Sequence, residues 1–399
     1  MSDIPVIRLL KSQERRVKAG HPWVYANEID TRETALKTLP VGDTALVEDY
    51  RGKFLGRATL SPHSLIAARI YSRDPKQALS RSFFKKRIEL ALTLREKLYE
   101  QPCYRLIYGE ADGLPGLVVD RFHDVLVLQT GTTSMEEQLP VIASALDALL
   151  NPAHILIKNE SAIRKLEGLD SYSGALKGDA LESVSVHENG MDFIAPIAEG
   201  QKTGWFYDHR VARQKMQALA PGARVLDVFS YCGGWGVQAA VAGATGVTCV
   251  DSSALALDYV ERNAALNGVT DKVATLQGDA FAVMKQLAAD GEKFDLVIID
   301  PPAFIKRKKD AKNGLAGYHA INELALRLVS PGGYLVSCSC SMHLASDKLL
   351  DIIRSSARHI DRQLQVLGSE GQGPDHPIHP AIPETAYLKS WFVRVLMPL

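Results

Sequence analysis

Two cysteines lie one serine apart in the last quarter of the chain, at Cys338 and Cys340, and the whole chain contains five. Residues 333–339 form an apolar run typical of a strand, on which residues two apart point to the same face. A disulfide between the two would be strained, because this spacing leaves little room for the S–S torsion. A metal site needs about four ligands, and the nearby histidines have no recognised zinc spacing, so we expect no bound metal.

Two roles then remain for these thiols, filling the core or attacking a substrate. Burial is the expected role of Cys338, since cysteine is often a small core residue. Cys340 is nearer to the carboxyl end of the predicted strand, where a thiol can be exposed. A thiolate that adds to C6 of a pyrimidine turns the ring into an enamine, whose C5 can attack an electrophilic methyl group. Cys340 is therefore the candidate nucleophile.

The stretch "IIDPPAF" places Asp300 directly before two prolines. Two prolines fix φ and remove two backbone donors, which makes a rigid rim beside a bound ligand. Such a rim is typical of methyltransferases that act on planar amines or bases. Asp300 could hydrogen-bond N3 of a pyrimidine, or donate to it when protonated, and so help the ring to accept a thiolate. The alternative to a ligand-binding role is purely structural, with Asp300 as a cap at the strand end and the two prolines as an ordinary turn.

A glycine-rich turn follows the strand predicted at 224–229 and precedes a helix, which is where doubly wound sheets bind a nucleotide. Asp251 ends the next strand and could accept both ribose hydroxyls. Asp279 ends the third and could accept an adenine amine. These features suit NAD as well as S-adenosylmethionine, and the Asp-Pro-Pro rim favours S-adenosylmethionine. The glycines of the turn are Gly233, Gly234 and Gly236.

Residues 196–399 must position these groups, and their pattern is a strict alternation of apolar strands and helices. Such alternation predicts an α/β fold with a doubly wound parallel sheet covered on both faces. Two further β-like runs at the C-terminal end complete a seven-stranded, Rossmann-like methyltransferase sheet. The seven strands are predicted at 224–229, 246–251, 273–278, 294–300, 333–339, 362–368 and 387–396.

Two smaller domains are predicted before this sheet. Residues 1–74 read as short β runs separated by turns, which indicates a small barrel or sandwich. Residues 75–195 mix helices and strands in an α+β domain, with helices over about 80–100 and 134–149 and a hairpin turn at Asn189-Gly190. We therefore expect three domains.

The charge is unevenly distributed along a chain whose net charge is zero. Residues 1–90 carry 17 Lys and Arg against 10 Asp and Glu, which leaves 29 against 36 in the remainder. The cluster "KRKK" at 306–309 directly follows the Asp-Pro-Pro rim. The basic first 90 residues and the 306–309 cluster could each contact nucleic-acid phosphate. The alternative for each is an ordinary solvated basic surface. Tyr318 or Trp235 could stack on a base, or belong to the core.

The sequence shows no secretory signal and no apolar run long enough to cross a bilayer. The cysteines follow no regular disulfide spacing. We therefore expect a cytoplasmic protein with no membrane partner.

Together these motifs resemble a known family, the bacterial 23S ribosomal RNA cytosine-C5 methyltransferases of the large ribosomal subunit, which carry an N-terminal PUA domain. The likeness runs over essentially the whole length and is carried by "ERRVKAGHPWVYANEI", "YGEADGLPGLVVDRF", "GQKTGWFYDHR", "DVFSYCGGWG", "NAALNG", "DPPAFIKRKKD" and "SCSCSMH". It implies a PUA-like domain over residues 1–74 and a S-adenosylmethionine-dependent methyltransferase domain over 196–399. It also implies 5-methylcytosine formation in 23S ribosomal RNA through a covalent cysteine adduct.

The resemblance also implies roles for particular residues. Cys340 would be the nucleophile and Asp300 would hold the base edge. Many members have an apolar residue in place of Cys338, which is here a second candidate thiol, and "DPPAF" lacks the cysteine that two-cysteine relatives carry. The cofactor would be held by Thr203, Asp208, Arg210, Asp227, Ser230, Tyr231, Gly233, Gly234, Gly236, Asp251, Asp279, Ala280 and Asp300.

Two other functions stay open. An enzyme that methylates an exocyclic amine of adenine or guanine would fit "DPPAF" and would not need Cys340. A noncatalytic RNA-binding factor would keep the fold without turnover. The target nucleotide and a homodimeric state are also left open.

Overall fold

The computed structural model describes residues 4–398. The chain divides into two compact units. The first unit runs up to Val184 and includes Ile197–Trp205 and Pro374–Thr385, and the second contains Ser185–Pro196, Phe206–Gly373 and the residues from Ala386 on. Division into three domains, at residues 1–74, 75–195 and 196–399, stays a prediction.

The N-terminal part of the first unit is a five-stranded sheet with strand order β1-β3-β4-β5-β2. Strands β4 and β5 are buried along almost their whole length, and small residues such as Ala58, Ala67 and Ala68 let them pack closely in the centre. The elements are β1 (Val6–Arg8), α1 (Glu14–Lys18), β2 (Trp23–Tyr25), β3 (Thr44–Glu48), β4 (Phe54–Leu60) and β5 (Ile66–Ser72).

The first unit contains a second five-stranded sheet, with order β10-β9-β8-β7-β6. The helix expected over 134–149 is two helices, because the chain bends at Gln138 and Pro140 can occupy only the first turn of the next helix. Strand β10 was not predicted, since its residues are almost all exposed and do not alternate. The elements are α2 (Arg81–Leu98), β6 (Cys103–Tyr108), β7 (Leu117–Phe122), β8 (Val125–Thr130), α3 (Thr133–Glu137), α4 (Leu139–Leu150), β9 (His154–Asn159) and β10 (Tyr172–Lys177).

A hairpin of β11 (Ser183–Glu188) and β12 (Met191–Pro196) forms its own two-stranded sheet. Its turn residues Asn189 and Gly190 both have positive φ, at 54° and 80°. That combination defines the two-residue hairpin turn expected from an Asn-Gly pair.

The second unit is built around the predicted seven-stranded sheet, with order β15-β14-β13-β16-β17-β19-β18. The first five strands in this order are parallel, and β19 runs antiparallel to both of its neighbours. The doubly wound α/β prediction is therefore confirmed. The strands are β13 (Arg224–Val228), β14 (Gly246–Asp251), β15 (Val273–Gln277), β16 (Phe294–Ile299), β17 (Val329–Ser339), β18 (Gln363–Glu370) and β19 (Lys389–Leu396).

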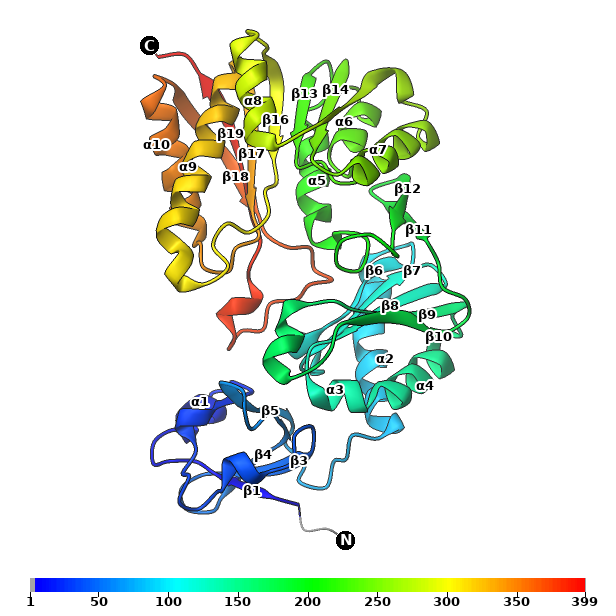
Figure 1. The fold of residues 1–399 in the computed structure, drawn as a ribbon, viewed down its shortest axis with the longest axis vertical. Helices are drawn as coiled ribbons and strands as arrows, with labels where there is room; N and C mark the ends of the chain where they lie inside the picture. The colour runs from blue at the N-terminus through cyan, green and yellow to red at the C-terminus, as the bar shows by residue number, and fades with distance from the viewer. Residues whose placement is uncertain (1–3, 399) are drawn as a thin grey trace. The chain divides into compact units, whose positions relative to one another are not determined.

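Helices cover both faces of this sheet, as Figure 1 shows. Alternate residues of β13 face opposite sides, so Leu226 and Val228 join the core under α8, α9 and α10, while Asp227 faces the start of α6. The helices are α5 (Arg210–Gln217), α6 (Gly236–Val241), α7 (Ala254–Leu266), α8 (Ala280–Ala289), α9 (Ala311–Leu328) and α10 (Ser346–His359).

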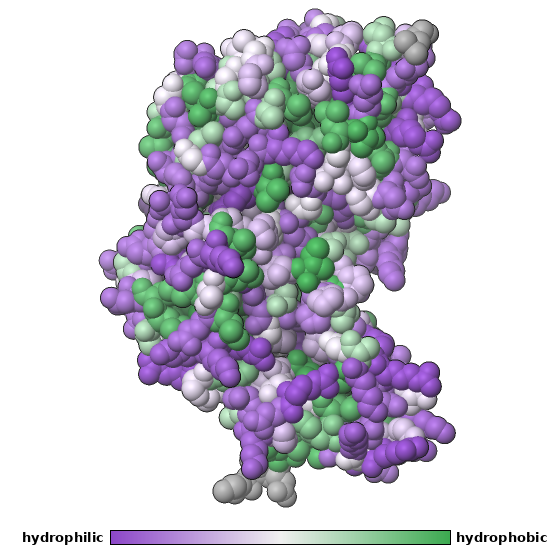
Figure 2. Space-filling model, turned by 180° about the vertical axis from the view of Figure 1, so that it is seen from behind, coloured by the Kyte–Doolittle hydropathy of each residue, from purple (hydrophilic) through white to green (hydrophobic). Residues whose placement is uncertain are grey.

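Hydrophilic residues cover most of the face shown in Figure 2, with apolar residues in groups between them. Among residues 4–398, no helix combines the length and the apolar character that crossing a membrane would require.

Candidate active site

The predicted site residues gather at the carboxyl ends of five parallel strands. Ser230 follows β13, Asp251 ends β14, Asp279 follows β15, Asp300 follows β16 and Cys340 follows β17. Because the strands are parallel, these ends share one edge of the sheet, which is where such sheets bind ligands.

The loop after β13 has an unusual backbone. Phe229 and Tyr231, neither of them glycine, have φ values of 65° and 47°, and left-handed residues of this kind cluster at functional sites. Asp251 holds the loop, since its Oδ2 accepts the backbone N–H of Tyr231 at 3.0 Å while its Oδ1 accepts that of Ser253 at 2.9 Å. The loop and the carboxylate expected to bind ribose are therefore one rigid assembly.

The glycines of this loop make room for protein atoms as well as for any ligand. A Cβ on Gly236 would lie 2.5 Å from Sγ of Cys249, and one on Gly234 would lie 2.9 Å from Cζ of Arg213. Close packing against β14 and α5 therefore requires glycine at both positions, whether or not a ligand is bound.

Asp227 is fully buried beneath the loop. Its Oδ2 accepts the backbone N–H of Gly236 at 2.8 Å. Within the described part of the chain, its Oδ1 and the hydroxyl of Ser230 are buried without a hydrogen-bond partner. Burial raises the pKa of Asp227 to about 7. These unpaired polar atoms fit a polar ligand at the loop, such as the amino acid part of S-adenosylmethionine.

Asp279 and Ala280 begin helix α8. Oδ1 of Asp279 accepts the N–H of Ala282 at 3.0 Å and so caps the helix, while its side chain stays exposed. Ala280 is buried. An exposed capping carboxylate keeps one oxygen for a ligand, as expected for an adenine contact.

Three predicted cofactor residues lie outside this loop. Thr203 belongs to the first unit, where its buried hydroxyl donates to the carboxylate of Asp120. Asp208 is buried in the second unit and accepts a hydrogen bond from the hydroxyl of Tyr387. Arg210, also buried, lies over the ring of Tyr207 at 5.0 Å. The structure places Asp208 and Arg210 in one unit with the glycine loop.

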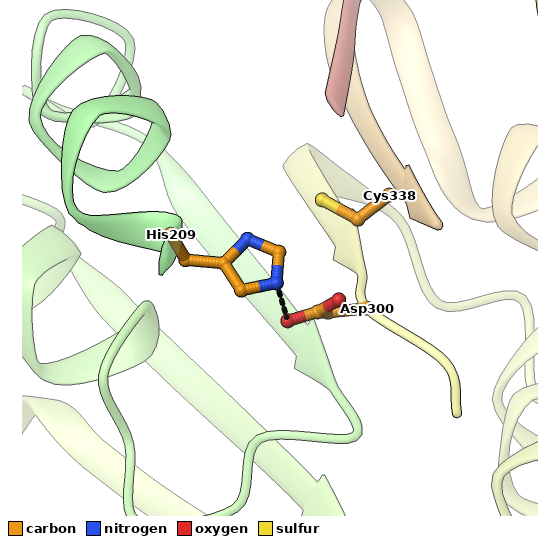
Figure 3. Close-up of side chains that lie close together, drawn as sticks. All are labelled: His209, Asp300 and Cys338. Atoms are coloured by element: carbon orange, nitrogen blue, oxygen red, sulfur yellow. Dashed lines mark ion pairs between the residues drawn. The ribbon is translucent and has the colours of Figure 1, made fainter. Parts of the chain in front are cut away.

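Asp300 is held by two side chains, His209 and Trp235. Its Oδ2 lies 3.1 Å from Nε2 of His209 and accepts the indole N–H of Trp235 at 3.3 Å. Figure 3 shows His209 and Asp300 side by side, with the thiol of Cys338 close to both. Trp235 is buried, as is Tyr318, whose hydroxyl bonds to Ser339, so neither of these two residues can stack on a substrate base.

The two neighbouring cysteines differ in exposure. Cys338 is fully buried, and burial raises the pKa of its thiol well above the usual range. Cys340 is only partly buried, unlike the other four cysteines. The structure therefore assigns Cys338 to the core, as the sequence suggested, and leaves Cys340 at the edge of the sheet.

Potential ligand atoms of His209, Asp300 and Cys338 lie within 4.8 Å of one another. Three donors fall short of the four that a closed structural zinc site needs. A thiol with a strongly raised pKa is also a poor metal ligand, because the thiolate is the form that binds.

A buried lysine lies beside the Cys340 loop. Nζ of Lys389 donates to the carbonyls of Ser341 and Leu344, at 2.5 and 2.6 Å. Burial lowers the pKa of Lys389 to about 8, and the nearby Cys340 opposes that shift. No local sequence pattern reveals Lys389 or His209, because the contacts of both residues come from strands and loops far away in the sequence.

Comparison with known proteins identifies the family of the chain. Residues 106–390 match a model described as S-adenosylmethionine-dependent methyltransferase, and residues 7–73 match a PUA-like domain. Ribosomal RNA large subunit methyltransferase I of Klebsiella pneumoniae is 36% identical over 397 residues, which cover 98% of each chain.

Solved structures share the fold. A Streptococcus mutans protein assigned as a SAM-dependent methyltransferase superposes with a TM-score of 0.83 at 20% identity, over 98% of this chain and 100% of the other. A structure of SMU.776 complexed with SAH gives the same TM-score, identity and coverage. At this identity the likeness concerns the fold alone.

Proposed function

The chain belongs to the family of S-adenosylmethionine-dependent methyltransferases and carries a PUA-like domain, and on that premise we propose that it forms 5-methylcytosine in large-subunit ribosomal RNA. Its cofactor is S-adenosylmethionine. The ribosomal substrate is suggested by the relatives, which are named ribosomal RNA large subunit methyltransferase I.

The position of Cys340 carries the proposal. It follows β17 directly, Asp300 follows β16 directly, and the two strands are parallel neighbours. The proposed nucleophile and the proposed base-binding carboxylate therefore lie at adjacent strand ends. Methylation of an amine needs only a lone pair, whereas C5 of a pyrimidine needs activation by such a nucleophile.

Lys389 supports a reactive Cys340. Its buried ammonium group interacts electrostatically with Cys340 and fixes the two carbonyls that follow it in the loop. A nearby cation favours the thiolate over the thiol, and the thiolate is the nucleophile.

The thiolate of Cys340 forms a bond to C6 of cytosine while N3 gains a proton from solvent, and the ring becomes a neutral enamine. The cofactor supplies an electrophilic methyl group, to which C5 forms a bond as the methyl–sulfur bond breaks. C5 then loses its proton to water, the C6–S bond breaks to release the thiolate, and N3 gives back its proton.

The site residues divide between these tasks. Asp300 would hold the base edge, and Cys338 would stay a neutral core thiol, which leaves its participation in product release without support. Cofactor contacts are proposed for Thr203, Asp208, Arg210, Asp227, Ser230, Tyr231, Gly233, Gly234, Gly236, Asp251, Asp279, Ala280 and Asp300.

Exposed positive charge would hold the RNA. All four residues of the 306–309 cluster are exposed, and three residues separate the cluster from the Asp-Pro-Pro rim. A base inside a helix must also leave its stack to reach the strand ends. The PUA-like domain, which lies within the net-positive first 90 residues, would add phosphate contacts.

The test is mass spectrometry of nucleosides from unmodified ribosomal RNA incubated with the protein and isotope-labelled S-adenosylmethionine. Labelled 5-methylcytidine is the expected product. Label in an adenine or guanine would replace this proposal by the exocyclic-amine reaction. RNA binding without any label, for both naked RNA and subunit particles, would favour a noncatalytic binding factor.

A further inference from the structure

His209 makes a contact that the proposed reaction steps do not use. It is 3% exposed and ends the short helix η5 (Tyr207–His209), far in sequence from Asp300. Its Nε2 lies 3.1 Å from Oδ2 of Asp300, the same oxygen that accepts the indole N–H of Trp235. Two nitrogens from separate segments thus converge on one carboxylate oxygen.

The surroundings hold the His209 ring in this orientation. The ring packs edge-on against Trp235, with centroids 5.5 Å apart and planes at 65°. Trp235 is fixed in turn by the Arg213 guanidinium, 5.9 Å from its ring centre, and Arg213 pairs with the buried Glu188 at 2.8 Å. Edge-on packing against the anchored Trp235 ring therefore holds the buried His209 side chain in a fixed position.

The hydrogen-bond pattern defines what Asp300 can offer. With its proton on Nε2, His209 donates to Oδ2, and Trp235 can only donate. Oδ2 is therefore an acceptor of two hydrogen bonds. Within residues 4–398, both of these hydrogen bonds go to Oδ2 and none goes to Oδ1, and the Asp300 side chain is 17% exposed. Asp300 thus offers one oxygen to a ligand.

We propose that His209 is a positioning residue that holds Asp300 as the hydrogen-bond acceptor for the amine edge of cytosine. This inference rests on the proposed cytosine methylation. An ionised carboxylate accepts the exocyclic N–H of cytosine and stabilises the proton that N3 gains when the thiolate adds. Uracil presents a carbonyl oxygen in place of that amine, which the carboxylate repels. His209 thereby acts on base choice and turnover without touching the substrate.

Two substitutions separate this role from simple core packing. His209→Leu fills the space and removes the donor, whereas His209→Gln keeps an N–H donor at the end of the side chain. The exposed His359 of the same unit offers a control, His359→Gln. The measurements are kcat and KM for RNA methylation, cofactor affinity by calorimetry, and the ratio of kcat/KM for RNA with cytosine or uracil at the target position.

The expected result is a loss in kcat of about 30-fold for His209→Leu, the size of a lost hydrogen bond to a charged group. Cofactor affinity should stay within about threefold of the wild type, and the cytosine-to-uracil ratio should fall. His209→Gln should restore most of kcat and of the ratio. An unchanged kcat in His209→Leu, or equal losses in both variants, would overturn the role of His209. Absence of 5-methylcytidine with the wild-type protein would instead refute the proposed function itself.

Discussion

The ammonium group of Lys389 donates a hydrogen bond to the backbone carbonyl of Ser341, with an Nζ–O distance of 2.5 Å. Lys389 begins β19, where it pairs with Ser339 of β17 in the antiparallel register. The contact therefore ties the last strand pair of the sheet to the segment that contains Cys340. A buried cation placed there can shape both the loop and the charge of its thiol.

Replacement of Lys389 by methionine should slow the reaction at the step that forms the C6–S bond. The change keeps most of the side-chain volume and removes the charge and the carbonyl contacts, so kcat should fall by about tenfold or more. Rapid-quench measurement of the covalent RNA adduct tests this. Lys285→Met, on an exposed lysine of the same unit, is the control. Adduct formation at the wild-type rate would show that Lys389 supports the fold only.

The paired cysteines should respond differently to the same substitution. Cys340→Ala should abolish 5-methylcytidine formation and leave cofactor binding intact. Cys338→Ala should keep activity and lose about 1–2 kcal/mol of stability, because it leaves a small cavity in the core. Nucleoside mass spectrometry and thermal unfolding provide the two measurements. Normal activity in Cys340→Ala would refute a thiol mechanism.

Asp227 should make the stability of the protein depend on pH. Its pKa is about 7 in the folded protein and near 4 in the unfolded chain. Between these values the folded state holds a proton that the unfolded state has lost, so this contribution to the unfolding free energy falls as pH rises from about 4 to 7. The full effect is roughly 4 kcal/mol.

Chemical unfolding of wild type and Asp227→Asn at several pH values tests this dependence. The variant cannot ionise, so its stability relative to the wild type should increase as pH rises through that window. Asp290→Asn, on an exposed helix end, provides the comparison. A constant difference between Asp227→Asn and wild type across the range would contradict the raised pKa.

The exposed basic cluster should contribute to the salt dependence of RNA binding. Arg307 pairs with Asp310 at 3.1 Å, so the variant of choice replaces Lys306, Lys308 and Lys309 with glutamine. Each lost phosphate contact reduces the slope of log affinity against log salt by about 0.7–0.9, so a reduction of about 2 is expected. Fluorescence anisotropy titrations at several salt concentrations measure it. A slope in the triple variant equal to that of the wild type would show that the cluster is ordinary solvated surface. The control is a variant with Lys285→Gln and Lys293→Gln.

The sequence by itself determined the seven-stranded sheet and the strand ends at which the functional side chains lie. Alternation of apolar strands with helices is a local pattern, and β14 begins and ends at the predicted residues, 246 and 251. The positions of Asp251, Asp300 and Cys340 at strand ends follow from the same pattern, because the carboxyl ends of parallel strands must share an edge.

Tertiary structure alone decided which neighbours these residues have. The sequence predicts a buried Cys338 and a Cys340 near the end of the strand, but the packing of β19 against β17 and the end of β17 at Ser339 decide that Cys338 is buried and Cys340 only partly buried. His209 reaches Asp300, and Lys389 reaches the Cys340 loop, across 91 and 49 residues of sequence. Contacts of this range depend on how distant segments fold together, and no local periodicity records them.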